Sequence, residues 1–304
     1  MRHFAAHAWR EQELALELLR AMRPKQWNKN ALVFAALVFD AKVTDGLYAV
    51  RAFIGFCVFC LISGAIYLIN DLTDMESDRH HPKKRHRPLA SGRLSVGVAR
   101  TATVVLLLIC LPIGFVLDPI FGAIVSLYLL LQMAYSFRLK NVVIVDVLTI
   151  AAGFVLRVAG GAELVQAERF SPWLYVCVVL LALFMGLSKR RGELVLLQEN
   201  ANSHRASLQD YSLPLLDELI SVVTATTVLA YALYTFEPGN PNLPENNAMM
   251  LTIPFVLYSI FRYLYLIHQK GETAPPDEVL LKDHPLQITI SLWGLTVLAL
   301  LYLA

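Results

Sequence analysis

Residues 70–78, Asn-Asp-Leu-Thr-Asp-Met-Glu-Ser-Asp, combine the side-chain types and the spacing best suited to chemistry. Asp71, Asp74 and Asp78 follow at intervals of three and four residues, which on a helix places three carboxylates on one face. Such neighbouring like charges repel unless a cation neutralises them. Mg²⁺ prefers hard oxygen ligands and binds a few carboxylates together with substrate phosphates. The segment therefore predicts a Mg²⁺ site formed by these aspartates, with Asn70 orienting the first carboxylate.

A dense basic run follows the acidic segment and contains Lys83, Arg85 and Arg87. Acids followed by bases fit a metal–diphosphate site, because carboxylates hold the metal while Lys or Arg neutralises the remaining phosphate charge. These three residues are therefore candidate phosphate ligands. A basic run beside a membrane span also has a purely topological explanation, which stays open here.

Three further polar segments border apolar stretches and could converge on the same site. They are residues 23–30 (Arg-Pro-Lys-Gln-Trp-Asn-Lys-Asn), 135–140 (Tyr-Ser-Phe-Arg-Leu-Lys) and 188–193 (Ser-Lys-Arg-Arg-Gly-Glu). Arg157 lies deeper, inside an apolar stretch, where a charge is expensive and marks a functional site by default. A buried ion pair with a carboxylate such as Asp146 or Glu163 explains this arginine equally well.

Apolar stretches must position these groups. Of the 304 residues, 57% are hydrophobic and only 16% are charged, against roughly 25% in soluble domains. A membrane-spanning helix requires about 20 mostly apolar residues. Nine stretches qualify, namely 28–48, 49–69, 97–117, 119–136, 141–162, 172–188, 213–235, 247–268 and 285–303. The sequence therefore predicts an all-α integral membrane protein, with a cytoplasmic or interfacial segment, 1–27, before one nine-helix domain, 28–304.

The distribution of basic residues predicts the orientation, because cytoplasmic loops retain Lys and Arg. With the N-terminus inside, 21 of the 26 Lys and Arg residues lie in cytoplasmic segments and three lie in external loops. We therefore expect a multi-pass protein of the cell membrane, with the N-terminus and the acidic segment cytoplasmic and the C-terminus external. Residues 9–22 have apolar side chains near helical spacing, which predicts a helix on the inner leaflet or a plain solvated helix.

The sequence resembles the UbiA superfamily of intramembrane prenyltransferases at these residues. The resemblance is carried by the Asn-Asp-x-x-Asp-x-x-x-Asp motif at 70–78 and extends from Arg23 to the ninth apolar stretch. It implies an all-α fold around a central, lipid-accessible cavity capped by cytoplasmic loops. The usual members carry a second Asp-x-x-x-Asp motif, for a second Mg²⁺, in the loop after the sixth span. Residues 188–200 contain no such pair, which argues against typical aromatic prenyl transfer.

Three phrases are instead similar to the polyprenyl-phosphate phosphoribosyltransferase branch of this superfamily. They are Arg-Pro-Lys-Gln-Trp-x-Lys-Asn at 23–30, Tyr-Ser-Phe-x-Leu-Lys at 135–140, and Ser-Lys-Arg-x-x-Glu-Leu at 188–194. That branch transfers the 5-phosphoribosyl group of phosphoribosyl diphosphate (PRPP) to a polyprenyl phosphate such as decaprenyl phosphate and releases diphosphate. In actinobacteria the product supplies arabinan synthesis for the cell wall. The resemblance implies this activity here, with Mg²⁺ as cofactor, PRPP and a polyprenyl phosphate as substrates, and no nucleic-acid partner.

The resemblance and the expected membrane depth together imply the residue roles. Asp71, Asp74 and Asp78 would hold Mg²⁺ against the diphosphate of PRPP. Two phosphorylated substrates demand additional positive charge, for which the candidates are Lys83, Arg85, Arg87, Lys140, Arg157, Lys189 and Arg190. Tyr135 and Lys140 are placed at PRPP, and Lys25 and Lys29 at the lipid phosphate. The sequence leaves open whether the protein forms a homo-oligomer.

Two other functions compete with this interpretation. An ordinary member of the superfamily would move a prenyl group from prenyl diphosphate to an aromatic or quinone-precursor acceptor, although the second acidic motif is missing. A cation channel or transporter could use carboxylates near a pore mouth as a selectivity site. The carboxylates lie among cations at the membrane edge, and most spans lack polar residues at their midplane, which argues against a permeation path.

Overall fold

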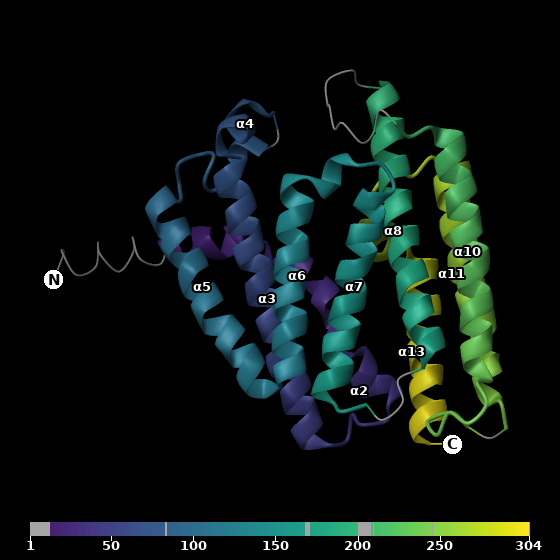
Figure 1. Ribbon diagram of the computed structural model, residues 1–304. Helices are drawn as coiled ribbons and strands as arrows, with labels where there is room; N and C mark the ends of the chain where they lie inside the picture. Colours follow the sequence, from purple (N-terminus) through teal and green to yellow (C-terminus); the bar gives the residue numbers. More distant parts are fainter. Residues whose placement is uncertain are drawn as a thin grey trace.

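The computed structural model describes residues 13–82, 84–167, 171–199, 208, 210–244 and 246–303, and within these it is helical, without a strand (Figure 1). Eight helices among them are long and apolar enough to cross a membrane. They are α3 (Gly46–Thr73), α5 (Val96–Leu117), α6 (Pro119–Phe137), α7 (Val145–Leu164), α8 (Pro172–Glu199), α10 (Leu213–Thr235), η4 with α11 (Ala248–Thr252 and Ile253–Gln269) and α13 (His284–Tyr302). The prediction of an all-α, multi-pass membrane fold is confirmed.

Short helices connect the long ones. They are the 3₁₀ helices η1 (Pro24–Phe34), η2 (Lys84–His86) and η3 (Leu139–Asn141), and the α-helices α2 (Ala35–Phe39), α4 (Met75–His80) and α12 (Pro276–Lys282). The predicted N-terminal helix at 9–22 is helical over 13–21, and residues 9–12 lie outside the described residues. Ala21 and Met22, at its end, are buried against Leu68 of α3. This contact fixes the N-terminal segment to the end of the bundle where α3 finishes.

Polar side chains set where most of the long helices begin. Five N-cap side chains accept hydrogen bonds from backbone N–H groups of the first turn, and they are Asp45, Ser95, Asp118, Ser212 and Asp283. Such a cap satisfies donors that have no partner within the helix. The helices α5 and α6 are joined directly at Asp118, so they pack as antiparallel neighbours.

The first predicted span, 28–48, does not form a long α-helix, because η1 and α2 are followed by a turn before α3. The segment still runs from one end of the bundle to the other. Arg23 contacts Asp71 near the end of α3, whereas the Lys42 ammonium donates to the Val165 carbonyl oxygen beyond the end of α7. At about 2.0 Å per 3₁₀ residue and 1.5 Å per α-helical residue, η1 and α2 extend roughly 30 Å. The predicted count of nine transmembrane helices is therefore not confirmed, since this crossing is irregular.

A close backbone contact holds η1 against α7. A Cβ atom on Gly161 would lie only 2.0 Å from the Val33 carbonyl oxygen, so the approach requires glycine. Non-helical backbone at membrane depth is tolerated where protein buries it or where it lines a polar cavity. Both conditions hold for η1, because Asn30 and Val33 are buried while Gln26 lines a cavity.

The predicted span 172–188 lies within a longer helix. α8 continues to Glu199, so residues 188–199 are helical and are not a cytoplasmic loop. Hydropathy ends the span where charges begin at Lys189, but those charges find partners within the protein and the helix continues. The remaining predicted spans agree with the observed helices to within a few residues.

Buried side chains form two large apolar clusters on either side of the molecule. One joins α3, α5, α6 and η1 through residues that include Phe59, Phe121 and Val125. The other joins α8, α10, α11 and α13 through residues that include Phe184 and Ile220. In Figure 1 the helix α7 stands between α6 and α8, with α4 at one end of the bundle and α2 at the other. The two clusters therefore leave a space at the centre, where polar side chains gather.

Candidate functional site

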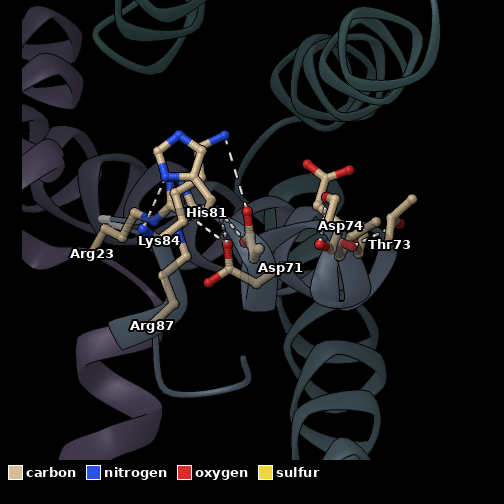
Figure 2. Close-up of polar contacts among 10 residues, drawn as sticks. Arg23, Asp71, Thr73, Asp74, His81, Lys84 and Arg87 are labelled. Atoms are coloured by element: carbon tan, nitrogen blue, oxygen red, sulfur yellow. Dashed lines mark hydrogen bonds and ion pairs between the residues drawn. The ribbon is translucent and has the colours of Figure 1, made fainter. Parts of the chain in front are cut away.

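The acidic segment 70–78 lies at the junction of two helices. α3 ends one residue before Asp74 and α4 begins one residue after it. Asp71 and Asp78 are each 2% exposed, whereas Asp74 is partly exposed. Figure 2 shows Asp74 on the side of Asp71 that faces away from the basic residues. The prediction that three carboxylates share one helix face is wrong, because a single helix does not extend through Asp74.

Basic side chains neutralise the two buried aspartates (Figure 2). Arg87 Nη1 lies 2.6 Å from Asp78 Oδ2 and 3.2 Å from Asp71 Oδ1. Arg23 Nη2 lies 2.5 Å from the same oxygen of Asp71, and Lys84 Nζ lies 4.0 Å from Asp78 Oδ1. Burying charges is costly unless each charge is paired and hydrogen-bonded. The shared guanidinium of Arg87 therefore holds together two carboxylates that would otherwise repel.

The residues present fit a divalent cation in part. Among the described residues, no group of three or more acidic, histidine or cysteine side chains could hold a metal ion. Asp71 and Asp78 nevertheless place carboxylate oxygens around one shared cationic nitrogen, and carboxylate oxygens are the ligands that Mg²⁺ prefers. Two of the three predicted ligands thus have the right chemistry and proximity, while Asp74 does not share their position.

A cavity of about 390 Å³ lies beside the aspartates and is lined by residues of α3, α6, α7, α8 and η1 and by Pro276 of α12. This volume is in the range of small-molecule sites, about 300–1,000 Å³. Its lining residues recur at helical spacing, so that one face of each long helix contributes. Four of the lining residues are cationic, and they are Arg23, Lys29, Arg157 and Lys189. Among the described residues, no carboxylate lines it.

The cavity brings together several residues that the sequence singled out. Its lining includes Asn70, Lys29, Tyr135, Arg157 and Lys189. Arg87 lies at the aspartates instead. Among the predicted residues that do not line the cavity are Lys25, Arg85 and Lys140. Lys83 lies outside the described residues.

Arg190 is not at the cavity wall, which corrects its expected place at a phosphate. Its side chain is 1% exposed, and its Nε lies 2.7 Å from Asp146 Oδ2. It also pairs with Glu193, and its Nη2 donates to the Tyr135 hydroxyl at 3.2 Å. Arg190 is therefore part of a buried ion-pair network, and it reaches the cavity only through Tyr135.

Arg157 settles the alternative that the sequence left open. Its Nε donates to Asn30 Oδ1 at 2.7 Å, and its Nη2 donates to the Tyr128 hydroxyl at 2.6 Å. Its Nη1 donates to a backbone carbonyl in the preceding turn of α7 at 2.8 Å. Neither Asp146 nor Glu163 pairs with it, and no other described carboxylate does so. Arg157 is thus a buried cation, 8% exposed, with neutral partners only.

Sequence reasoning missed Arg23, Asn30, Tyr128 and Gln132 as site residues. A signal existed for two of them, because Tyr128 and Gln132 lie one helical turn apart within an otherwise apolar span. Polar residues repeated at helical spacing in a membrane helix mark a face turned away from lipid. The contact of Arg23 with Asp71 joins residues 48 positions apart, so no local pattern could show it.

Comparisons with known proteins agree with the fold. Residues 31–280 match the UbiA prenyltransferase family. The chain is 32% identical over 297 residues to decaprenyl-phosphate phosphoribosyltransferase of Corynebacterium glutamicum, covering 95% of this chain and 88% of that protein. It is 33% identical over 298 residues to the protein of the same name from Mycolicibacterium smegmatis, covering 94% and 92%.

A solved structure shares the fold. The structure of a UbiA homolog from Archaeoglobus fulgidus bound to GPP and Mg²⁺ matches with a TM-score of 0.71 at 19% identity, covering 94% of this chain and 99% of that chain. The resemblance inferred from the acidic motif is therefore confirmed, and so is the prediction that the protein is a transferase. The family match covers most of the chain, and the chain belongs to the UbiA prenyltransferase family.

Proposed function

We propose that the protein transfers the 5-phosphoribosyl group of PRPP to a polyprenyl phosphate of the decaprenyl type and releases diphosphate. The reaction would take place at the cytoplasmic membrane face with Mg²⁺ as cofactor. The observation that carries this proposal is the charge of the cavity, whose described lining contains no carboxylate and four cations, one of which, Arg23, is paired with Asp71 behind the wall. Charges at membrane depth are costly and mark substrate sites, so such a cavity calls for an anionic occupant. PRPP has phosphoryl groups at both ends of its ribose and fits this requirement.

The relatives support the same substrate pair. Two proteins that match along almost their whole length are named decaprenyl-phosphate phosphoribosyltransferase. The second acidic motif expected of ordinary family members is missing from residues 188–200. The described part of this stretch is helical and contributes Lys189, not a carboxylate, to the cavity. The positive cavity and these relatives together favour a soluble, phosphorylated donor.

Asp71 and Asp78 would hold Mg²⁺, with Asn70 between them and the cavity. When bound there, Mg²⁺ neutralises part of the charge on the diphosphate leaving group. Arg23 and Arg87, which pair with these aspartates, would add positive charge around the same group. The A. fulgidus homolog binds Mg²⁺ together with GPP, which supports the use of a divalent metal by a protein of this fold.

The transfer exchanges one C–O bond for another at the ribose. The bond between C1 and the diphosphate oxygen breaks, and an oxygen of the lipid phosphate bonds to C1 from the opposite face, which inverts the configuration. A phosphate monoester has its second pKa near 6, so the nucleophile is largely ionised at neutral pH. No general base is required, in keeping with a described cavity lining that contains no Asp, Glu or His.

The two substrates would approach from different sides. Tyr135, near the end of α6, lines the cavity and accepts a hydrogen bond from Arg190, and Lys140 follows in η3, so both are assigned to PRPP. Lys25 is exposed whereas Lys29, one turn of η1 further on, lines the cavity. This pair offers cations from the surface to the cavity and is placed at the lipid phosphate.

A radiochemical assay tests the proposal. Purified protein is incubated with Mg²⁺, labelled PRPP and decaprenyl phosphate, with prenyl diphosphate plus 4-hydroxybenzoate in a parallel reaction. We expect label to move into the organic phase, to stay in water when EDTA removes the metal, and to move again once Mg²⁺ is restored. Product in the parallel reaction alone would contradict the proposal and identify an ordinary prenyltransferase.

A further inference from the structure

Arg157 lies at the inner end of the cavity. The Tyr128 hydroxyl lies 2.6 Å from Arg157 Nη2 and 3.3 Å from Ser63 Oγ, so these three side chains form the cavity floor. Asn70 lies seven residues further along α3, next to the aspartates. At 1.5 Å per residue the floor is roughly 10 Å from that end, the mouth. The cavity therefore presents cationic groups at two separate levels.

The guanidinium at the floor has donors to spare. A guanidinium carries five N–H donors, and the acceptors described for Arg157 use three, one on each nitrogen. One N–H therefore remains on each terminal nitrogen. Remaining donors of a guanidinium can form charge-assisted hydrogen bonds with phosphate oxygens. Because Arg157 lines the cavity, an occupant can reach them.

Within the described part of the chain, no carboxylate pairs with the guanidinium at the floor. The guanidinium carbon lies 4.7 Å from the centre of the Tyr128 ring and 5.3 Å from that of Phe154. Such contacts stabilise a cation without neutralising it. A buried charge without a counter-ion is costly. An anion bound at this point would neutralise the guanidinium and accept hydrogen bonds from its remaining N–H groups.

We propose that the floor formed by Arg157, Tyr128 and Ser63 binds a phosphate monoester, and that this group is the 5-phosphate of the sugar donor. The identification of the ligand rests on the phosphoribosyl transfer proposed above. The diphosphate then points to the mouth, where Asn70, Lys189 and the aspartates lie. The lipid phosphate then attacks C1 from the face opposite the diphosphate.

A polyprenyl phosphate carries the same headgroup chemistry, so the two sources must be separated. With its headgroup at the floor, the polyprenyl chain would pass Gln132, Asn70 and Lys189 before it left the cavity. Placing an apolar chain against such groups removes water from them without replacing its hydrogen bonds. The polar wall therefore favours the sugar phosphate.

Binding measurements on the detergent-solubilised full chain test this assignment without turnover. Calorimetric titrations use ribose 5-phosphate, inorganic diphosphate with Mg²⁺, and farnesyl phosphate as the lipid probe. For Arg157→Gln we expect ribose 5-phosphate to bind roughly 10- to 100-fold more weakly, as expected for the loss of charged hydrogen bonds. Binding of diphosphate and of farnesyl phosphate should be unchanged. Arg51→Gln is the matched control, because Arg51 donates to the Leu117 carbonyl oxygen at the opposite end of the bundle.

Tyr128→Phe provides a second variant if Arg157→Gln fails to fold, since it removes one hydroxyl and keeps the ring. We expect this variant to weaken the binding of ribose 5-phosphate by a smaller factor than Arg157→Gln does, and to leave the binding of diphosphate unchanged. The assignment is overturned if wild-type protein does not bind ribose 5-phosphate. It is also overturned if the variants weaken the binding of farnesyl phosphate or of diphosphate and leave the binding of ribose 5-phosphate unchanged. Binding of ribose 5-phosphate through Arg157 without transfer from PRPP would refute the proposed function alone. Transfer with ribose 5-phosphate binding unaltered in the variants would refute the floor assignment alone.

Discussion

Asp71 is a buried carboxylate that pairs with two arginines. One of its oxygens accepts hydrogen bonds from both Arg23 and Arg87, and Arg87 in turn bridges to Asp78. Each partner comes from a different segment, so the fold, and not the motif, sets the position of the carboxylate. The neighbouring Glu76 is exposed and pairs with Arg79 in the adjacent turn. Two acids five positions apart are thus in opposite environments.

This contrast predicts different effects of neutralising each acid. Asp71→Asn should lower turnover by about 10²–10³-fold, because the variant loses a charged group that would hold the metal and organise the arginines. Glu76→Gln should retain wild-type turnover. Rates of phosphoribosyl transfer at saturating PRPP measure both variants, and size-exclusion profiles confirm that they are folded. Similar activity in the two variants would count against Asp71 as a metal ligand.

The helix α8 shows how an element continues past the apparent edge of a span. Arg190 lies beyond the predicted end of this helix, yet it is buried against Asp146 of α7, whose side chain is fully buried. A Cβ atom on Gly192 would lie 2.3 Å from the Thr273 carbonyl oxygen, so the segment before α12 packs directly on the same turn. The ion pair holds α7 against α8, and the backbone contact holds the segment before α12 against α8.

Breaking this ion pair on one side should destabilise the protein. Arg190→Met leaves the Asp146 carboxylate buried without its cation, and a loss of about 3–5 kcal/mol is expected for such a change. The double variant Asp146→Asn with Arg190→Met removes both charges and should recover part of the loss. Thermal unfolding in detergent compares the two variants with wild type. Equal stability of the single and double variants would show that the pair is not coupled.

Tyr211, in the segment before α10, contacts α7 and should make the stability of the protein depend on pH. Its hydroxyl accepts a hydrogen bond from Ile144 N–H at 2.7 Å and donates to Asp146 Oδ1 at 2.9 Å. Burial raises the pKa of Tyr211 to about 12, from about 10 in an unfolded chain. The neutral phenol is therefore favoured by folding, and its contribution to stability is complete below pH 10 and is lost as the pH rises towards 12.

Tyr211→Phe should remove this alkaline component. We expect the unfolding temperature of wild type to fall more steeply than that of the variant between about pH 10 and 12, because only wild type has this titrating phenol. Below pH 10 the variant should be the less stable protein, since Asp146 and Ile144 lose a hydrogen-bond partner. Parallel pH profiles across the whole range would contradict the role assigned to the Tyr211 hydroxyl.

At the scale of the whole molecule, two apolar clusters enclose a polar, positive cavity that lies beside the buried aspartates. The two ends of the bundle differ in the number of basic residues named here. Arg23, Arg87 and Lys189 lie at the end with the aspartates, whereas Lys42 and Arg51 lie at the other. Cytoplasmic segments retain basic residues, so the site is expected on the cytoplasmic face.

Cysteine labelling tests this orientation. Two exposed positions are suited to single-cysteine substitution. Lys270 lies at the end of α11, and Pro241 lies in the connection between α10 and η4. In a background with the four native cysteines replaced by alanine, a membrane-impermeant maleimide should label Pro241→Cys in intact cells. It should label Lys270→Cys only after permeabilisation. The reverse result would place the site on the external face.

The sequence by itself determined the membrane class, most helix boundaries and the acidic motif. These features are local, because about 20 apolar residues suffice to define a span and a few neighbouring residues define a motif. The same local reasoning predicted a regular helix at 28–48 and an end to the sixth span at 188. The first is not confirmed, and the helix continues past 188, because buried contacts with distant residues hold η1 in an irregular form and extend α8.

Only the tertiary structure decided which charges meet. Arg157 donates a hydrogen bond to Asn30, 127 positions away, and Asp146 pairs with Arg190. The sequence had equally allowed a pair between Arg157 and Asp146. Hydropathy fixes the depth of a side chain in the membrane, but the direction in which it points depends on how the helices pack around one another. For this reason the sequence indicated the residues of the site, and the fold separated those that line the cavity from those that support it.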